Sequence, residues 1–354
     1  MRGVEASSTS LARIARHGLR SGARTGWFLA KIIVPLSAGV AVLSWTGALA
    51  AIGRVLAPAM RLFGLPGVAA VPLVAGWTAG VYGGIAAATT LPLTYAQLNV
   101  LAIMVLTAHN LPIESAIASR SGASGPRVSV VRLAVAVILG ALLWQVLRHG
   151  SLATTLAPHA VTAGEDPSLS AFALAWLLGN VKLVVKIFAI VVVLTIATDL
   201  MRAYGVFDLL ARRLRPLMAL LGLSERVTFL WLTGTFLGLS YGSGLIIQEA
   251  RTPGRFRRGD LRDLHVSIGI AHSLLEDTLL FAAVGVNPLF VLLPRPVAAA
   301  IAVRAGRGFV TERPAATAIE PSETAEAADP TEVGDPGETT EVGATAHRAM
   351  SPGA

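Results

Sequence analysis

The sequence predicts an all-α integral membrane protein with two inverted repeats, made of about six transmembrane helices and two Gly-rich re-entrant segments. Three observations support this fold class. The chain is 54% hydrophobic and only 14% charged, two motifs recur in the same order, and the arginines sort to one membrane face in only one topology. A soluble domain carries about a quarter charged residues, so insertion into the lipid bilayer is the default interpretation.

Apolar runs place the transmembrane helices, because a span needs roughly 20 mostly apolar residues. Such runs, with a shorter last one, cover residues 28–52, 98–117, 128–147, 171–200, 265–284 and 288–303.

The two ends of the chain differ from this apolar pattern. Residues 1–26 are basic with apolar side chains on one helical face, which predicts an amphipathic segment on the cytoplasmic membrane surface. Residues 305–354 are rich in Glu, Thr, Pro and Gly and predict a disordered acidic tail. Cysteine is absent, which excludes disulfides, thiolate metal ligands and a cysteine nucleophile.

An internal repeat divides the membrane part. Gly76–Gly84 and Gly234–Gly244 share a Gly-x-x-x-Gly pattern followed by Tyr and Gly. Downstream, Thr107–Glu114 matches Ile270–Asp277 in a histidine followed by carboxylates. The repeat predicts a first copy at 27–120, a connecting helix and loop at 121–169, a second copy at 170–285 and a last membrane segment at 286–304.

The arginines decide the topology through the positive-inside rule. If the Gly-rich runs 65–88 and 227–247 both crossed the membrane, the basic cluster 212–215 would lie opposite the cluster 251–262. If both runs re-enter instead, almost all basic clusters, including the one at 120–132, lie on one face. Irregular backbone at membrane depth is tolerated where it lines a cavity. This topology inverts the repeats and puts both termini in the cytoplasm, and the Ala- and Arg-rich composition favours a bacterial inner membrane.

Each repeat places a histidine and carboxylates inside an apolar run, where ionisable side chains are costly and by default functional. His272 and Glu276 are four apart and share a helix face, with Asp277 one step round. His109 and Glu114 are five apart, and a helix break at the proline between them is expected to bring them together. If the two helices cross at the midplane, both histidines, Glu114 and Asp277 (or Glu276) converge on one site, and two imidazoles with two or three carboxylates suit Zn, Fe or Mn.

The residues after the histidines and those of the Gly motifs are expected to line the substrate path. These candidates are Asn110, Ser273, Gly80, Tyr82, Gly83, Gly238, Tyr241 and Gly242.

Other interpretations of these residues stay open. Buried His and carboxylates also suit a proton relay, or they pair only to hold two helices together, and Gly-x-x-x-Gly also serves close helix packing. The candidate functions are therefore a divalent metal permease, a proton-coupled permease for nucleosides or other small solutes, and a non-transporting scaffold or signalling protein. An enzyme is not expected, since a His-Glu-x-x-His helix is missing. Membrane orientation, rather than nucleic-acid binding, explains the net charge of +8.

In these motifs the chain resembles the nucleoside-recognition, or Gate, family of bacterial membrane proteins, which includes spore maturation proteins. Gate segments also occur in concentrative nucleoside transporters and in bacterial ferrous iron permeases. The resemblance rests on residues 76–84 with 107–114 and 234–244 with 271–277, and covers most of 30–285. It implies transport or substrate gating, with a homo- or hetero-oligomer that includes a second Gate-type subunit as an expected assembly. The chain departs from the iron permeases in lacking a GTPase domain and cysteine.

Overall fold

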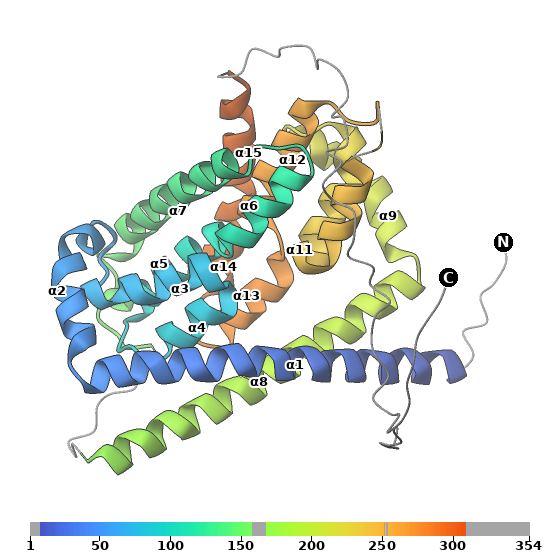
Figure 1. Cartoon of the computed structure of the whole chain (residues 1–354). Helices are drawn as coiled ribbons and strands as arrows, with labels where there is room; N and C mark the ends of the chain where they lie inside the picture. Colours follow the sequence, from blue (N-terminus) through green and yellow to red (C-terminus); the bar gives the residue numbers. More distant parts are fainter. Residues whose placement is uncertain (1–7, 158–167, 251, 253, 309–354) are drawn as a thin grey trace, which may run out of the picture. The chain divides into compact units, whose positions relative to one another are not determined.

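The computed structural model describes residues 8–157, 168–250, 252 and 254–308; for 8–15, 17, 202, 207–208, 211, 215 and 236–242 it describes the backbone alone. The described residues form helices and no β-strand, as the sequence predicts (Figure 1). The first half contains α1 (Ser8–Trp45), α2 (Ala48–Met60), η1 (Arg61–Phe63), η2 (Gly67–Ala69), α3 (Ala70–Ala79), α4 (Val81–Ala88), α5 (Tyr95–Ala108), α6 (Leu111–Arg120), α7 (Gly125–Leu147) and η3 (Ser151–Ala153). The second half contains α8 (Leu169–Ala203), α9 (Val206–Arg213), α10 (Arg215–Leu221), η4 (Glu225–Val227), α11 (Thr228–Ala250), α12 (Arg258–Ala271), α13 (Leu274–Ala282), α14 (Pro288–Leu292) and α15 (Pro294–Gly308).

Several of these helical segments are long and apolar enough to cross a membrane. They are Gly18–Trp45, Tyr95–Arg120, Gly125–Leu147, Leu169–Met201 and Pro288–Arg307, with a sixth if the pair Ala48–Phe63 and Gly67–Ala79, bent by 87°, counts as one span. The all-α membrane fold is thus confirmed. The predicted span 265–284 is not among them; its residues lie in α12 and α13.

Two predicted boundaries differ from the observed elements. The helix α1 runs without a break through residue 26, so the basic segment is the first half of a long helix rather than a separate element. Residues 305–308 complete α15. The rest of the predicted acidic tail lies outside the described residues.

Backbone features recur along the two halves of the chain. Gly47 and Gly205, which directly precede α2 and α9, both have positive φ, and so do Gly64 and Gly222 at the ends of η1 and α10. Each pair lies 158 positions apart (47 to 205, 64 to 222), and η2 and η4 keep this offset. Glycine adopts positive φ without a steric penalty, so the recurrence marks equivalent turns. The internal repeat therefore extends upstream to the ends of α1 and α8.

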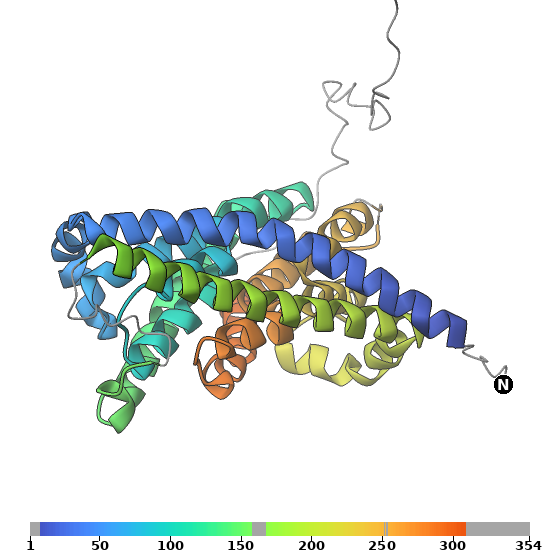
Figure 2. The same ribbon diagram turned by 90° about the horizontal axis from the view of Figure 1, so that it is seen from below.

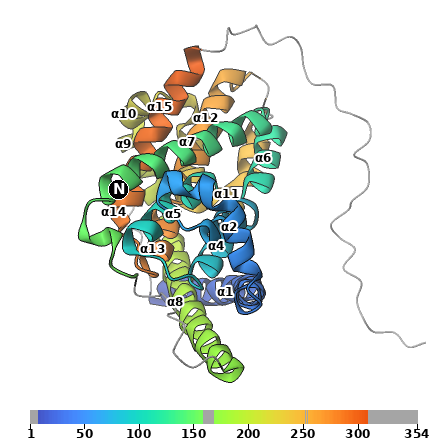
Figure 3. The ribbon, with the colours of Figure 1, turned by 90° about the vertical axis from the view of Figure 1, so that its left-hand side faces the viewer.

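The helices α1 and α8 pack against each other in opposite directions (Figures 2 and 3). Gly18 lies against Ile196 and Gly26 lies against Phe188, with Gly22 between them on the same face of α1. Small residues four apart let two membrane helices approach closely. Inverted repeats require such an antiparallel relation between equivalent helices; the inversion itself stays a prediction.

The first Gly-rich run folds back on itself, and the second does not. Gly80, with φ 86°, joins α3 to α4, and a Cβ on Gly84 would lie 3.3 Å from the Cα of Gly76. The helices α3 and α4 therefore form an antiparallel hairpin, as expected of a re-entrant segment. The second run is the unbroken helix α11, so the second predicted re-entrant segment is wrong. A Gly-x-x-x-Gly pattern is equally compatible with a continuous helix and does not by itself specify a turn.

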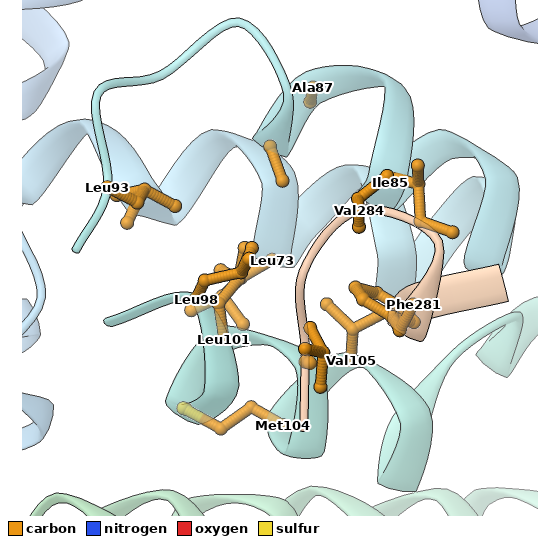
Figure 4. Packing of buried hydrophobic residues seen from close by; sticks show 14 of the residues in the cluster. Leu73, Ile85, Ala87, Leu93, Leu98, Leu101, Met104, Val105, Phe281 and Val284 are labelled. Atoms are coloured by element: carbon orange, nitrogen blue, oxygen red, sulfur yellow. The ribbon is translucent and has the colours of Figure 1, made fainter. Parts of the chain in front are cut away.

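The hydrophobic core surrounds α5. Twelve of the 14 residues of this helix are buried, so α5 is apolar on every side, which is typical of a helix enclosed by others. Its position is fixed by contacts from both halves of the chain, and these contacts also fix the histidine at its end. Figure 4 shows Leu98, Leu101, Met104 and Val105 of α5 with Leu73, Ile85, Phe281 and Val284.

Candidate metal centre

The histidines of both repeats end a helix rather than lie within one. His109 follows α5 and His272 follows α12, each in an extended conformation. The next residues, Asn110 (φ 54°) and Ser273 (φ 46°), are left-handed and start α6 and α13. They are the two non-glycine residues with positive φ in the described part of the chain. Such strained backbone is uncommon and clusters at functional sites.

The first helix breaks earlier than the sequence predicts. The break falls at Asn110, and Pro112 lies in the first turn of α6. A proline is tolerated there, because the first backbone N–H groups of a helix have no partner within it. The equivalent break at Ser273 occurs without a proline. The left-handed residue after each histidine, rather than the proline, is therefore the shared feature.

The two imidazoles present the same ring nitrogen, Nε2, to Glu114. His109 Nδ1 lies 3.2 Å from the carbonyl oxygen of Leu106, and His272 Nδ1 lies 2.6 Å from that of Ile268. A carbonyl only accepts, so each Nδ1 carries the proton and each Nε2 keeps a lone pair. The ring centroids are 4.6 Å apart. A backbone acceptor on one imidazole nitrogen is the usual support of a metal-binding histidine.

Two carboxylates face these Nε2 atoms. Glu114 Oε1 lies 3.6 Å from His109 Nε2 and 3.2 Å from His272 Nε2, and Asp277 Oδ2 lies 3.8 Å from His109 Nε2. All four side chains are buried. Bonds of about 2.1 Å to a tetrahedral ion separate ligand atoms by about 3.4 Å. One ring nitrogen of each histidine and a Glu114 oxygen lie within 4.8 Å of one another, so a small contraction fits them to a transition metal.

Two buried arginines, Arg132 and Arg295, support the helix breaks. Arg132 of α7 donates from Nε to the carbonyl of Thr107 (3.2 Å) and from Nη2 to that of His109 (2.8 Å). Arg295 of α15 donates in the same way to Ile270 (3.0 Å) and His272 (2.9 Å). These carbonyls lie at helix ends and lack helical partners. The arginines thus satisfy the acceptors that each break exposes.

Sequence reasoning missed both arginines, although a signal was available. Arg132 belongs to a basic cluster that the topology explains, and Arg295 lies between two prolines in the short last run. Each arginine follows the histidine of its repeat by 23 residues. The repeat therefore includes an arginine as well as the histidine and the carboxylate.

The third contact distinguishes the two arginines. Arg132 Nη1 donates to Glu114 Oε2 at 2.5 Å. Among the described residues, Arg295 Nη1 and Asp277 Oδ2 are buried atoms without a hydrogen-bond partner. The centre is therefore paired on the side of the first repeat and unpaired on the side of the second.

Glu276, the other carboxylate of the second repeat, forms its hydrogen bond with a residue that does not belong to the centre. Tyr82 of α4 donates its hydroxyl proton to Glu276 Oε1 at 2.7 Å. Asp277 occupies the position of Glu114, since each is the fourth residue of its helix after the break. The second repeat thus offers Asp277 to the centre, and the bond between Tyr82 and Glu276 connects the α3–α4 hairpin to α13.

The structure describes the contacts of the first Gly motif, but not those of the side chains at 236–242 in the second. The carbonyl of Gly76 accepts from Asn110 N–H at 3.1 Å, which brings the tip of the hairpin at Gly80 to the first helix break. Gly83 instead packs against Leu36 and the backbone of α3, as a packing residue does. The side chains of Gly238, Tyr241 and Gly242 lie outside the described part.

Fold and centre together define a multi-pass helical membrane protein with a buried His–carboxylate site at two helix breaks. The profile of the family described as nucleoside recognition, or Gate, matches residues 27–127, which include His109 and Glu114. The uncharacterized membrane protein YvoD of Bacillus subtilis (strain 168) is 33% identical over 277 residues, which are 78% of this chain and 88% of that protein. The chain therefore belongs to the Gate family of membrane proteins. No solved structure matches it.

Proposed function

We propose that the protein is a membrane permease whose cargo is a divalent transition metal ion, bound between the two helix breaks. The observation that carries this proposal is the convergence of one ligand atom each from His109, His272 and Glu114 within 4.8 Å of one another in a buried site. Asp277 Oδ2, a buried atom 3.8 Å from His109 Nε2, supplies a fourth donor from the second repeat. Imidazole and carboxylate donors together suit Zn, Fe(II) or Mn better than Mg or Ca, which prefer oxygen alone.

Transport, rather than a resident structural metal, is supported by the elements that carry the ligands. Broken helices and re-entrant hairpins typically surround the substrate site of secondary transporters. Here two broken helices supply all four donors, and the tip of the α3–α4 hairpin contacts the first break through Gly76 and Asn110. We further propose a bacterial inner-membrane location with both termini in the cytoplasm, and assembly with a second Gate-type subunit.

The test combines binding and uptake. Purified protein in detergent is titrated with Zn²⁺ and Mn²⁺, and proteoliposomes are assayed for uptake of the same ions. We expect binding with one site per chain, lost together with uptake in the variant His109→Ala/His272→Ala. The control is His149→Ala, which removes an exposed histidine remote from the centre. Metal binding that survives the double substitution overturns the proposal.

One observation favours a second candidate, an organic-solute or nucleoside permease coupled to protons. Arg132 and Arg295 offset the charges of Glu114 and Asp277 without any cation, so the centre does not need a metal to be neutral. The neutral imidazoles would then take up protons. Thermal stabilisation by nucleosides and uptake driven by a pH gradient, with no response to metals, would favour this function. A protein that binds neither kind of ligand would leave the centre as a helix-holding element of a membrane scaffold.

A further inference from the structure

The centre contains equal numbers of positive and negative charges before cargo arrives. Arg132 and Arg295 are buried beside Glu114 and Asp277, and with both imidazoles neutral these four groups sum to zero. A divalent ion alone would raise the total to +2, and counting Glu276 at the rim still leaves a positive charge. Uncompensated charge at membrane depth is costly. A bare ion is therefore a poor fit to the charges of this centre.

An unpaired donor lies where a compensating anion would bind. Arg295 places Nε and Nη2 on the carbonyls of the second repeat that are equivalent to those bound by Arg132, so we infer that its Nη1 lies on the side of Asp277, the counterpart of Glu114. That nitrogen has no acceptor among the described residues, and Arg295 is 0% exposed. A buried donor without an acceptor is unfavourable, and a guanidinium fork suits the oxygens of carboxylate and phosphate groups.

A cationic cavity near the centre provides the second observation. It has a volume of about 510 Å³ and lies between α8, the end of α4 and the end of α13. Lys182 and Lys186 line it, together with Asn180, and no carboxylate does. Lys186 donates to the carbonyl of Ala283, whereas Lys182 makes no such bond among the described residues. A cleft lined by positive charge concentrates anions and repels bare cations.

The cavity and the centre share α13. Asp277 lies near the start of this helix and Ala283 follows its end, about 9 Å further along the axis at 1.5 Å per residue. At the opposite end of α13 from the cavity, the hydrogen bond from Tyr82 to Glu276 joins α4 to α13. The lysines therefore lie beyond the C-terminal end of the same helix that carries Asp277 near its start.

We propose that the cargo is a metal ion together with a small oxyanion, a carboxylate or phosphate group whose oxygen accepts from Arg295 Nη1. This inference rests on the proposed metal-permease function and specifies its substrate. Asp277, both imidazoles and Glu114 hold the metal, and Arg295 holds the anion, which returns the buried charge toward zero.

The test measures Zn²⁺ affinity calorimetrically with chloride or with acetate as the anion, at equal ionic strength. We expect acetate to tighten Zn²⁺ binding about tenfold in the unmodified protein, since hydrogen bonds to charged groups are strong. Arg295→Gln should abolish this acetate effect, and Arg295→Lys should restore part of it. Arg304→Gln, in the same helix but outside the centre, should keep the full effect. The comparison in the unmodified protein needs no variant to fold.

The outcomes separate this inference from the proposed function. Equal Zn²⁺ affinity in chloride and acetate overturns the paired cargo and leaves the metal permease standing. No Zn²⁺ binding with either anion overturns both. Acetate binding in the absence of any Zn²⁺ binding also overturns both and favours an organic-anion permease.

Discussion

Arg132 and Arg295 make matching hydrogen bonds to the two helix breaks and differ in the third contact: Arg132 also holds Glu114, whereas Arg295 Nη1 has no partner among the described residues. The repeat is therefore symmetric in its backbone support and asymmetric in its charge pairing. If the centre binds cargo as proposed, the carboxylate of the first repeat is already paired within the protein, and the polar groups of the second repeat are available to the cargo.

The ion pair between Arg132 and Glu114 is expected to be essential to stability. Both side chains are buried, and removing one partner of a buried pair leaves an uncompensated charge at a cost of about 3–5 kcal/mol. Arg132→Met should therefore lower the unfolding midpoint strongly in detergent, as followed by circular dichroism. Adding Glu114→Gln should recover part of the loss. Arg127→Met, an exposed arginine of the same helix, is the control, and a loss as large in that variant would contradict the prediction.

Asp277 and Glu276, the neighbouring carboxylates of the second repeat, are expected to contribute differently to Zn²⁺ affinity. Asp277 faces His109 Nε2, whereas Glu276 is bonded to Tyr82. Asp277→Asn should therefore weaken Zn²⁺ binding at least about tenfold, because it removes a charged ligand. Glu276→Gln and Tyr82→Phe should change the affinity by less than about threefold. Isothermal titration calorimetry of the three variants measures their Zn²⁺ affinity. A larger loss of affinity in Glu276→Gln than in Asp277→Asn would mean that Glu276 is the ligand.

The fold class and most of the centre were predictable from the sequence, because ionisable residues inside long apolar runs are conspicuous. Their spacing also predicted one composite site from two repeats. The pairing of Glu276 was not predictable in this way. Helical register places Glu276 beside His272, but that register is interrupted at Ser273, where the backbone turns left-handed. Because of this break, Asp277, five residues after His272, faces the centre in place of Glu276.

Two further features were not predictable from the sequence: the buried position of Arg132 and the continuous helix formed by the second Gly-rich run. Arg132 fits the positive-inside pattern, so a surface role accounts for it in the sequence, although its side chain lies in the interior. The run that forms α11 shares its glycine spacing with the α3–α4 hairpin, yet only Gly80 adopts the turn. Spacing alone does not report φ, and the difference arises from tertiary contacts.

The left-handed residues after the histidines are expected to tolerate different side chains. Ser273 has φ 46°, a conformation that Asn adopts more readily than Ser and that β-branched residues strongly disfavour. Ser273→Asn, which copies Asn110, should leave stability unchanged or slightly higher, and Ser273→Val should destabilise by about 1–2 kcal/mol. Thermal unfolding of both variants tests this, and a more stable valine variant would argue against the observed break.

The glycine face of α1 is expected to set the distance between the two long helices. A Cβ on Gly22 would lie 2.9 Å from the Cα of Val192, so the backbones must separate to admit even a methyl group. Gly22→Ala should therefore destabilise by about 1–3 kcal/mol, the usual effect of overpacking. Gly39→Ala is the matched control, because Gly39 lies in the same helix and a Cβ there would have no neighbouring atom within 4 Å. Alanine there should be neutral or stabilising, since it favours the helix over glycine. Equal melting temperatures for the two variants would mean that α1 and α8 do not depend on this close approach.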